Sequence, residues 1–266
     1  MATVNVTSWA EFVQAVGVPG DTVVLPNKAE WDMNELYPEG YTGTINTKCS
    51  QINGNGTKIK NLHLFGCFVK TRNVSVTIND LEMTNFVVEP VDASYNAVFT
   101  GFSQLNLHNC IFSGLCGSYI SSFSVGYLYL DRASMNINFT TSANSFGVFP
   151  VQDAKYSRIK QSIPNAIATS TDKWFGTCKF CELDVYMPQL AAGKLNVSNL
   201  SACKLLGGYG DATFYENSAS SAREFPSIYL TDAIPDAIDG QYMRGVTRDQ
   251  MRDAAYLASL GFPVGV

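Results

Sequence analysis

Apolar and polar residues alternate in short segments that recur along the middle of the chain. Each segment has two alternating apolar residues, a polar pair often containing Asn or Asp, and two further alternating apolar residues. Period-two alternation predicts a strand with one face inward. The polar pair predicts a tight corner, because Asn tolerates left-handed backbone angles. The segments are 57–64, 76–83, 105–112, 128–135 and 195–202, with 178–185 as an intermediate copy.

The spacing of these segments predicts stacked coils. From the residue before each corner, the steps are 59→78, 78→107, 107→130 and 130→197, the last corresponding to roughly three turns of about 22 residues. The unit recurs in one orientation, and hairpin signals such as Asn-Gly are scarce. We therefore predict an all-β fold, a right-handed parallel β-helix. A β-sandwich of many short strands is the alternative.

A short helix is predicted before the first strand. Ser8 is a candidate N-cap, Glu11 lies three residues on as in a capping box, and Gly17 and Pro19 end the helix. Its apolar stripe consists of Trp9, Phe12, Val13 and Val16. With the strand at 21–25 it predicts an N-terminal capping helix, because an uncovered stack would expose core side chains.

A second short helix is predicted near the C-terminus. Thr247 and Gln250 form a capping box, and Gly261 and Pro263 end the helix. Its large apolar side chains would be sticky in water, so we expect them to pack on the β-helix, on sister chains or on another protein. These candidate assembly and attachment residues are Met251, Tyr256, Leu257, Leu260 and Phe262.

These patterns divide the chain into four parts. Residues 1–30 hold the N-terminal cap helix and first strand, and 31–208 form the parallel β-helix. Residues 209–246 show no clean repeat and are interpreted as an extended or looped segment, and 247–266 hold the C-terminal helix and tail.

Composition narrows the partners. Hydrophobic residues make up 46% and charged residues 15% of the 266, and the net charge is −5. No basic stripe is present, so we expect no nucleic-acid partner. No apolar run of membrane-spanning length and no signal-peptide pattern occur, so we expect no membrane partner and no export. The seven cysteines, an odd number, are interpreted as reduced thiols buried in the stack.

Two segments carry a resemblance to known proteins. Residues 9–15 followed by 20–25 resemble the N-terminal cap and first strand of pectate-lyase-like β-helix proteins, and residues 53–62 resemble their first-coil signature. This resemblance covers about residues 5–208 and implies the fold only, because lyases, hydrolases, adhesins and viral spikes share it. Residues 251–266 resemble a C-terminal segment of structural proteins of bacteriophages and related elements of Gram-positive gut bacteria.

The chain shows no complete catalytic constellation. Asp80 and Asp131 are aligned at one corner position, and Glu182 and Asp184 share a strand face, but both pairs fit a solvated surface. Residues 157–160 are similar to one element of polygalacturonase-type glycosidases, whose other elements are absent.

Histidine and cysteine patterns add no site. His63 and His108 are expected on the surface, and Cys178-x-x-Cys181 has no partner pair at metal spacing. Residues 207–210 lack the Lys-Ser/Thr of a phosphate loop. We therefore predict no catalytic residue, cofactor or metal.

Exposed aromatic side chains would suit contacts with sugar rings. The candidates are Tyr127, Tyr129, Trp174 and Tyr186, although the favoured interpretation is that such rings fill the coil interior or a subunit interface. We expect a non-enzymatic bacteriophage virion protein, a capsid decoration, fibre or tail-associated adhesin that forms a homotrimer and contacts other virion proteins and a host surface glycan. The alternatives are a polysaccharide lyase or hydrolase, and a bacterial surface adhesin.

Overall fold

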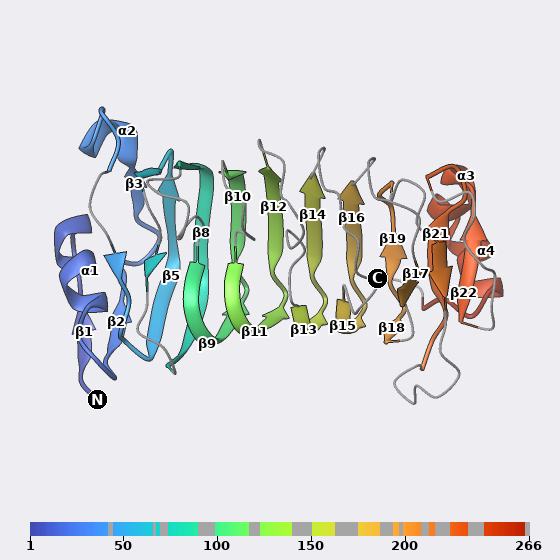
Figure 1. Ribbon diagram of the computed structural model, residues 1–266, viewed down its shortest axis with the longest axis horizontal. Coiled ribbons are helices and arrows are strands. Elements are labelled where there is room, and N and C mark those ends of the chain that lie inside the picture. The colour runs from blue at the N-terminus through green and yellow to red at the C-terminus, as the bar shows by residue number, and fades with distance from the viewer. Residues whose placement is uncertain are drawn as a thin grey trace.

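In the computed structural model, strands are the main regular element and helices lie near both ends (Figure 1). The structure describes residues 1–41, 45–65, 68–69, 74–89, 99–116, 123–139, 151–162, 175–186, 194–196, 199–208, 213–215, 224–233 and 242–263. The strands up to the middle of the chain are β1 (Thr3–Asn5), β2 (Thr22–Val24), β3 (Glu30–Asp32), β4 (Ile45–Asn46), β5 (Gln51–Lys60), β6 (His63–Phe65), β7 (Phe68–Val69), β8 (Ser75–Glu89), β9 (Phe99–His108), β10 (Ile111–Cys116) and β11 (Phe123–Asp131). Those that follow are β12 (Ser134–Phe139), β13 (Val151–Lys155), β14 (Arg158–Ser162), β15 (Phe175–Lys179), β16 (Glu182–Tyr186), β17 (Lys194–Asn196), β18 (Leu200–Ser201), β19 (Lys204–Leu205), β20 (Thr213–Tyr215), β21 (Ser227–Leu230) and β22 (Met243–Val246). The helices are α1 (Trp9–Val16), α2 (Met33–Leu36), α3 (Arg248–Arg252) and α4 (Ala254–Ser259).

Every strand pair within the described residues is parallel. The chain therefore forms a parallel β-solenoid, and the antiparallel β-sandwich is excluded. Each coil has a first arm and a second arm. The first arms run through β2, the start of β5 and of β8, then β9, β11, β13, β15 and β18. The second arms run through β3, the end of β5, the middle of β8, then β10, β12, β14, β16, β19, β21 and β22.

Inward-facing residues of successive coils lie directly over one another and form two buried columns. The first-arm column is Val23, Ile52, Ile78, Leu107, Leu130, Ala154, Cys178 and Leu200. The second-arm column is Trp31, Ile59, Met83, Phe112, Met135, Ile159, Leu183, Leu205 and Tyr229. These columns are the hydrophobic core, because alternation along each arm directs every second side chain into the coil.

A non-glycine residue with a positive φ angle stands between the two arms of successive coils. These residues form a row that we call the corner ladder, and their φ angles lie between 50° and 55°. The left-handed conformation turns the chain sharply, and backbone hydrogen bonds then join each corner to the next coil, as from Asn109 N–H to the Asp131 carbonyl. The ladder consists of Lys28, Asn55, Asp80, Asn109, Arg132, Tyr156, Phe180 and Ala202.

The observed register corrects the alignment of three segments. Residues 57–64 span a second corner at Asn61, so that Ile59 lies opposite Met83 and Leu64 opposite Val88. In segment 195–202 the corner falls at Ala202, and in 178–185 it falls at Phe180. Asp80 and Asp131 are consequently not at the same position, because Asp131 lies opposite His108 and precedes its own corner.

A complete coil at 151–162 escaped the sequence pattern. Leu107, Leu130, Ala154, Cys178 and Leu200 occupy one column, which gives steps of 23, 24, 24 and 22 residues. The coil was missed because small and polar residues, Ala154 and Ser157, fill its inward positions. The expected count of three turns between residue 130 and the coil near residue 200 is confirmed.

The predicted N-terminal helix is present as α1, which lies at the N-terminal end of the stack in Figure 1. The Ser8 hydroxyl accepts a hydrogen bond from the Glu11 N–H at 3.3 Å, as predicted. The Glu11 carboxylate accepts from the backbone N–H and hydroxyl of Thr7. These hydrogen bonds from Thr7 lower the pKa of Glu11. Trp9, Phe12 and Val16 are buried against the first coils.

Strand stacking continues beyond residue 208. Strand β21 pairs with β19 and β22 pairs with β21, so the interpretation of 209–246 as an extended or looped segment missed these strands. Their pattern is obscured because Ser227 and Ile228 are both buried, which breaks the alternation.

The C-terminal helix is divided in two. Thr247 and Gln250 form the predicted capping box of α3, but Asp253 adopts an extended conformation and caps α4 with its carboxylate. Gly261 has a φ of +79°, as expected for the residue that ends a helix. Of the candidate attachment residues, Leu257 and Phe262 are buried against Ala202, Ile228 and Val246, whereas Met251, Tyr256 and Leu260 are partly buried. Packing on the chain's own solenoid is therefore the arrangement that the structure adopts.

Truncation of a core column should destabilise the fold far more than truncation of its neighbour. Phe112 is fully buried between Met83 and Met135, so Phe112→Ala should lower the free energy of unfolding by about 3–5 kcal/mol. Ile111 precedes it on the same strand with 44% of its side chain exposed, and Ile111→Ala is the matched control, expected to cost under about 1 kcal/mol. Urea denaturation measures both, and equal losses would contradict the inward assignment of Phe112.

Candidate functional site

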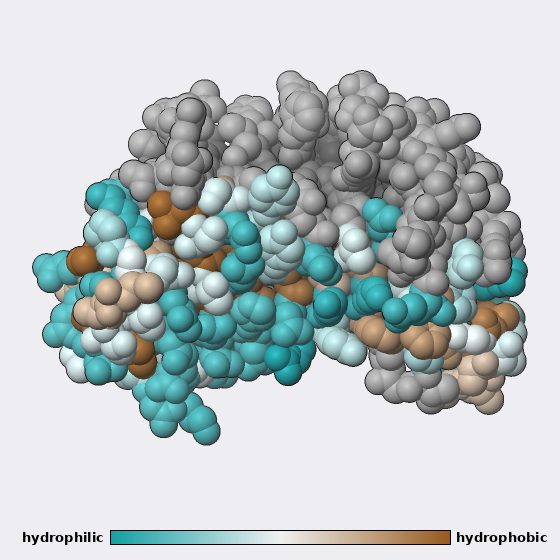
Figure 2. All heavy atoms as spheres, turned by 90° about the horizontal axis from the view of Figure 1, so that it is seen from below, coloured by the Kyte–Doolittle hydropathy of each residue, from teal (hydrophilic) through white to brown (hydrophobic). Residues whose placement is uncertain are grey.

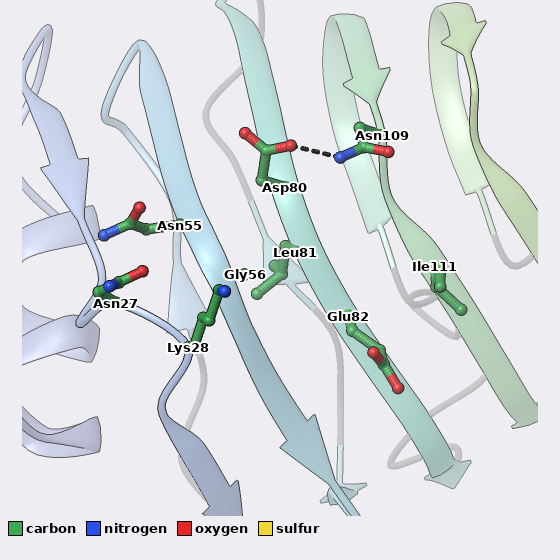
Figure 3. Close-up of a pocket in the computed structure, with 9 residues that line it drawn as sticks. All are labelled: Asn27, Lys28, Asn55, Gly56, Asp80, Leu81, Glu82, Asn109 and Ile111. Carbon is green, nitrogen blue, oxygen red and sulfur yellow. Dashed lines mark hydrogen bonds between the residues drawn. The ribbon is translucent and has the colours of Figure 1, made fainter.

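A groove crosses several coils on the second-arm side of the corner ladder, as the close-up in Figure 3 shows. Its volume is about 390 Å³, and polar and charged side chains predominate in its lining. We call it the corner groove. Its lining consists of Asn27, Lys28, Asn55, Gly56, Asp80, Leu81, Glu82, Asn109 and Ile111.

The groove arises where the corner of one coil is longer than that of the next. Asn53 lies opposite Asn79 and Thr57 opposite Leu81, so three residues of β5, at 54–56, face the single corner residue Asp80 of β8. The sequence Gly-Asn-Gly supplies this longer corner, because Asn55 and Gly56 both adopt positive φ angles. A close backbone approach at Gly54 brings the two corners together: an added Cβ would lie 2.8 Å from the Asp80 carbonyl carbon and from Leu81 Cα.

The carboxylates of the groove already have partners. Asp80 Oδ1 accepts a hydrogen bond of 2.5 Å from the Asn109 side-chain amide, and Figure 3 shows these two groups directed toward each other across adjacent coils. Glu82 forms an ion pair of 3.1 Å with Lys58. Figure 3 shows Glu82 pointing away from Asp80 along β8. The two carboxylates therefore do not face each other as the catalytic pair of a glycosidase does.

A second hollow lies at the same position on later coils. It has a volume of about 250 Å³ and contains the stacked rings of Tyr156 and Phe180, whose centroids are 5.0 Å apart with the planes inclined by 2°. Both hollows lie between the corner ladder and the first outward-facing residues of the second arms, so they follow one ridge of the solenoid. The second hollow is lined by Tyr156, Ser157, Arg158, Phe180, Cys181, Glu182 and Lys204.

Outward-facing charges on the second arms are paired between coils. Arg158 Nε lies 2.8 Å from Glu182, and Lys160 Nζ lies 3.5 Å from Asp184. The glycosidase-like element at 157–160 and the Glu182–Asp184 pair thus meet as two ion pairs on the outer face. Such exposed pairs contribute little stability, at most about 1 kcal/mol each.

Oppositely charged side chains are also paired between the first coils. Lys60 Nζ lies 2.6 Å from Glu30, and this hydrogen bond raises the pKa of Lys60. A hydrogen bond from the Asn61 amide lowers the pKa of Asp32 on the same face. In Figure 2 hydrophilic residues predominate over the N-terminal half of the coloured surface, and hydrophobic residues emerge there as separate spots.

The predicted sugar-contact residues do not form one site. Tyr127 and Tyr129 lie on β11, in a first arm, where Tyr127 is exposed and Tyr129 is half-buried. Tyr186 is exposed at the end of β16, in the second arm of a coil two turns further on. Trp174 lies outside the described residues.

The corner groove and the aromatic pair Tyr156–Phe180 were missed by sequence reasoning. The signal that could have found them is the corner ladder itself, because its members recur every 22–29 residues and place Asn55, Asp80 and Asn109 in one row. The alignment of segment 57–64 placed the corner of this coil after Ile59 instead of at Asn55, so the row was not recognised.

The remaining candidates are surface or core residues. His63 is half-exposed beside Glu89 at 2.9 Å, and His108 lies 3.5 Å from Asp131, which confirms the surface prediction. Among the described cysteines, Cys49, Cys110, Cys178, Cys181 and Cys203 are buried and not disulfide-bonded, as predicted. Across the described part of the chain, no three His, Cys, Asp or Glu residues are arranged to hold a metal ion. None of the helices there is long and apolar enough to cross a bilayer.

The corner groove has the chemistry of a site for a polar ligand. Amides, carboxylates and one lysine ammonium line it, and groups of this kind exchange hydrogen bonds with the hydroxyls of a saccharide. The exposed Ile111 side chain offers an apolar contact at one edge. Because the hollows follow one ridge, an extended ligand would run parallel to the solenoid axis.

Together these features define a class of protein, the parallel β-solenoids, with a polar groove along one ridge. No protein-family model, curated protein or solved structure matches this chain.

The close backbone approach at Gly54 should leave no room for a larger residue at this position. Gly54→Ala places a methyl group against the backbone of Asp80 and Leu81 and should destabilise the protein by about 1–3 kcal/mol. Gly208→Ala is the control, because its added Cβ would meet the Tyr186 ring at 3.4 Å and the Ala233 carbonyl oxygen at 3.9 Å, which are ordinary contacts. Thermal denaturation compares the two, and an unchanged midpoint for Gly54→Ala would refute the close approach.

Proposed function

We propose that this chain is a non-enzymatic structural protein of a bacteriophage particle, either a capsid decoration or fibre protein or a tail-associated adhesin. The observation that carries the proposal is the unbroken register of the core columns from Val23 to Leu200 and from Trp31 to Tyr229. A solenoid of this kind is a stiff rod, because each coil is hydrogen-bonded to both neighbours. The resemblance of residues 251–266 to bacteriophage structural proteins supports the same assignment.

Two finer features belong to this proposal. The solenoid is right-handed, as parallel strand crossovers nearly always are. Helix α1 closes its N-terminal end, where Trp9 packs edge-on against Trp31 and Tyr41 and covers the first coil. The α3–α4 unit then stands at the opposite end, and its half-buried Met251, Tyr256 and Leu260 are the residues offered to a second protein.

A homotrimer is the assembly that this architecture favours. Flat solenoid sides bury large areas when three copies pack around one axis, and closed rotational symmetry limits the growth of the assembly. Light scattering on the purified chain should give three times 29.0 kDa, about 87 kDa. A mass of 29 kDa at all concentrations would contradict the trimer.

Particle composition tests the virion assignment directly. Quantitative mass spectrometry of purified bacteriophage particles should detect the chain at a fixed copy number relative to the major capsid protein. Hundreds of copies would indicate capsid decoration, and a few or a few dozen would indicate the tail. Absence from particles whose genome encodes the chain would refute the proposal.

The corner groove favours a second candidate function, recognition or cleavage of a host surface polysaccharide. The supporting observation is that Asp80, Glu82 and Lys28 line one open groove with three amide side chains. Binding without cleavage agrees with the structural role, because an adhesin retains its ligand. Cleavage would require Asp80 or Glu82 to leave its present partner.

Groove variants separate binding from cleavage. The probe is a surface polysaccharide purified from the host bacterium, followed by gel retardation and by assays of reducing ends and unsaturated products. We expect retention without product, and an affinity at least tenfold weaker for Asp80→Ala, because Asp80 holds Asn109 in the groove wall. Asp184→Ala, on the outer face of β16, is the matched control. Product release abolished by Asp80→Ala would instead establish an enzyme.

A further inference from the structure

Three cysteine thiols gather in the interior beside the corner ladder. Cys178 belongs to the first-arm column, and Cys181 and Cys203 follow their corners at equivalent positions of successive coils. All three are buried and none is disulfide-bonded. The thiol of Cys203 donates to the Cys178 carbonyl at 3.3 Å, and Cys181 shares hydrogen bonds with both other thiols. This cluster is used neither by the corner groove nor by the proposed structural role.

Cys181 and Cys203 are close enough in successive coils for their thiols to react with each other. Glu182 lies opposite Lys204 in parallel register, so the preceding residues Cys181 and Cys203 are stacked neighbours. Parallel strands are about 4.8 Å apart, within the 4.4–6.8 Å range of Cα separations that a disulfide spans.

Cys181 is also the member of the cluster that lines a hollow at the surface. The second hollow holds Arg158 and Lys204 beside it, together with the carboxylate of Glu182. The hollow has a volume of about 250 Å³, and Cys181 is part of its lining with 2% of its surface exposed.

The pKa values of the three thiols are shifted in different directions by their surroundings. Hydrogen bonds from Cys178 and Cys203, and from the Ser157 backbone N–H, lower the pKa of Cys181. The hydrogen bond to Cys181 and burial raise the pKa of Cys178, and burial followed by the same kind of hydrogen bond raises that of Cys203. The thiolate, which is the reactive form, is therefore favoured at Cys181.

We propose that Cys181 is a peroxide-reactive cysteine that Cys203 resolves, forming a disulfide that ties two successive coils together. The Cys181 sulfur attacks hydrogen peroxide, so that an S–O bond forms, the O–O bond breaks and one water leaves. The Cys203 sulfur then attacks the sulfenic acid, so that an S–S bond forms, the S–O bond breaks and a second water leaves. Two thiols are oxidised and one peroxide is reduced.

Peptide mapping tests this assignment sharply, because the sequence separates the three cysteines. Trypsin cleaves after Lys173, Lys179, Lys194 and Lys204, which places Cys178, Cys181 and Cys203 on different peptides. The folded full-length chain is treated with hydrogen peroxide, its remaining thiols are alkylated, and it is digested without reduction. We expect the peptides 180–194 and 195–204 to be linked.

Variants identify the attacking and resolving residues. Cys203→Ser should leave a sulfenic acid at Cys181 that a dimedone probe traps, and Cys181→Ser should abolish both the link and the trapped adduct. Serine fits these positions, because Ser157 and Ser227 occupy the same row of the stack. Ser157 also donates to the carbonyl two residues earlier, as Cys181 and Cys203 do.

Cys110 is the matched control, because it stands in that row between Leu81 and Ala133 without a neighbouring thiol. It should stay alkylatable after denaturation of the treated protein. Oxidation should also raise the urea concentration at the unfolding midpoint of the chain without substitutions, and should leave that of the Cys181→Ser and Cys203→Ser variants unchanged. A link between the Cys178 and Cys181 peptides, no link at all, or equal oxidation of Cys110 would overturn the proposal.

Discussion

The structure depends on one constraint, that every coil turns at the same place so that its inward residues lie over those of the previous coil. The corner ladder meets it with a left-handed residue in each coil. For a residue other than glycine this conformation costs about 1–2 kcal/mol. The cost is offset because an in-register coil completes its backbone hydrogen bonds and buries a full set of apolar side chains, each worth roughly 1.5–3 kcal/mol.

The residue that follows each corner shows how the turn is held. Where this residue is a serine or a cysteine, its side chain can donate to the carbonyl two residues earlier, as in Ser157 to Lys155 at 2.8 Å and Cys181 to Lys179 at 3.2 Å. Serine hydroxyls in this row also accept from the previous coil, as from the Ala133 N–H at 3.1 Å. The serine hydroxyls thereby pair the backbone N–H groups of Ala133 and Cys203, whereas the Lys155 and Lys179 carbonyls also accept backbone hydrogen bonds. This explains the cysteines without a disulfide framework, and it is also what brings two thiols into adjacent coils.

Sequence reasoning could predict the fold because its strongest signal is periodic. The units around Leu107 and Leu130 alternate cleanly and set the coil length, so the parallel stack followed from them. Both end helices followed from their capping residues. The site could not be predicted as readily, because it depends on register. The extra residues Gly54–Gly56 face a single Asp80, and only pairing reveals that Asn55, Asp80 and Asn109 share a ridge. Small inward residues such as Ala154 also fail to give the alternation of large apolar residues by which a coil is recognised in the sequence.

The character of the ridge changes along the chain, and the change has a physical logic. Early corners carry Asn55, Asp80 and Asn109, which tolerate positive φ angles well, and the Asp80 and Asn109 side chains are hydrogen-bonded to each other in the groove wall. Tyr156 and Phe180 pay a larger backbone cost, and their parallel rings at 5.0 Å return only about 0.5–1.5 kcal/mol. Stacking thus offsets only part of the strain at those two corners, because each costs about 1–2 kcal/mol. The later corners thus carry a stacked aromatic pair, whereas the polar corners line the corner groove on the earlier coils.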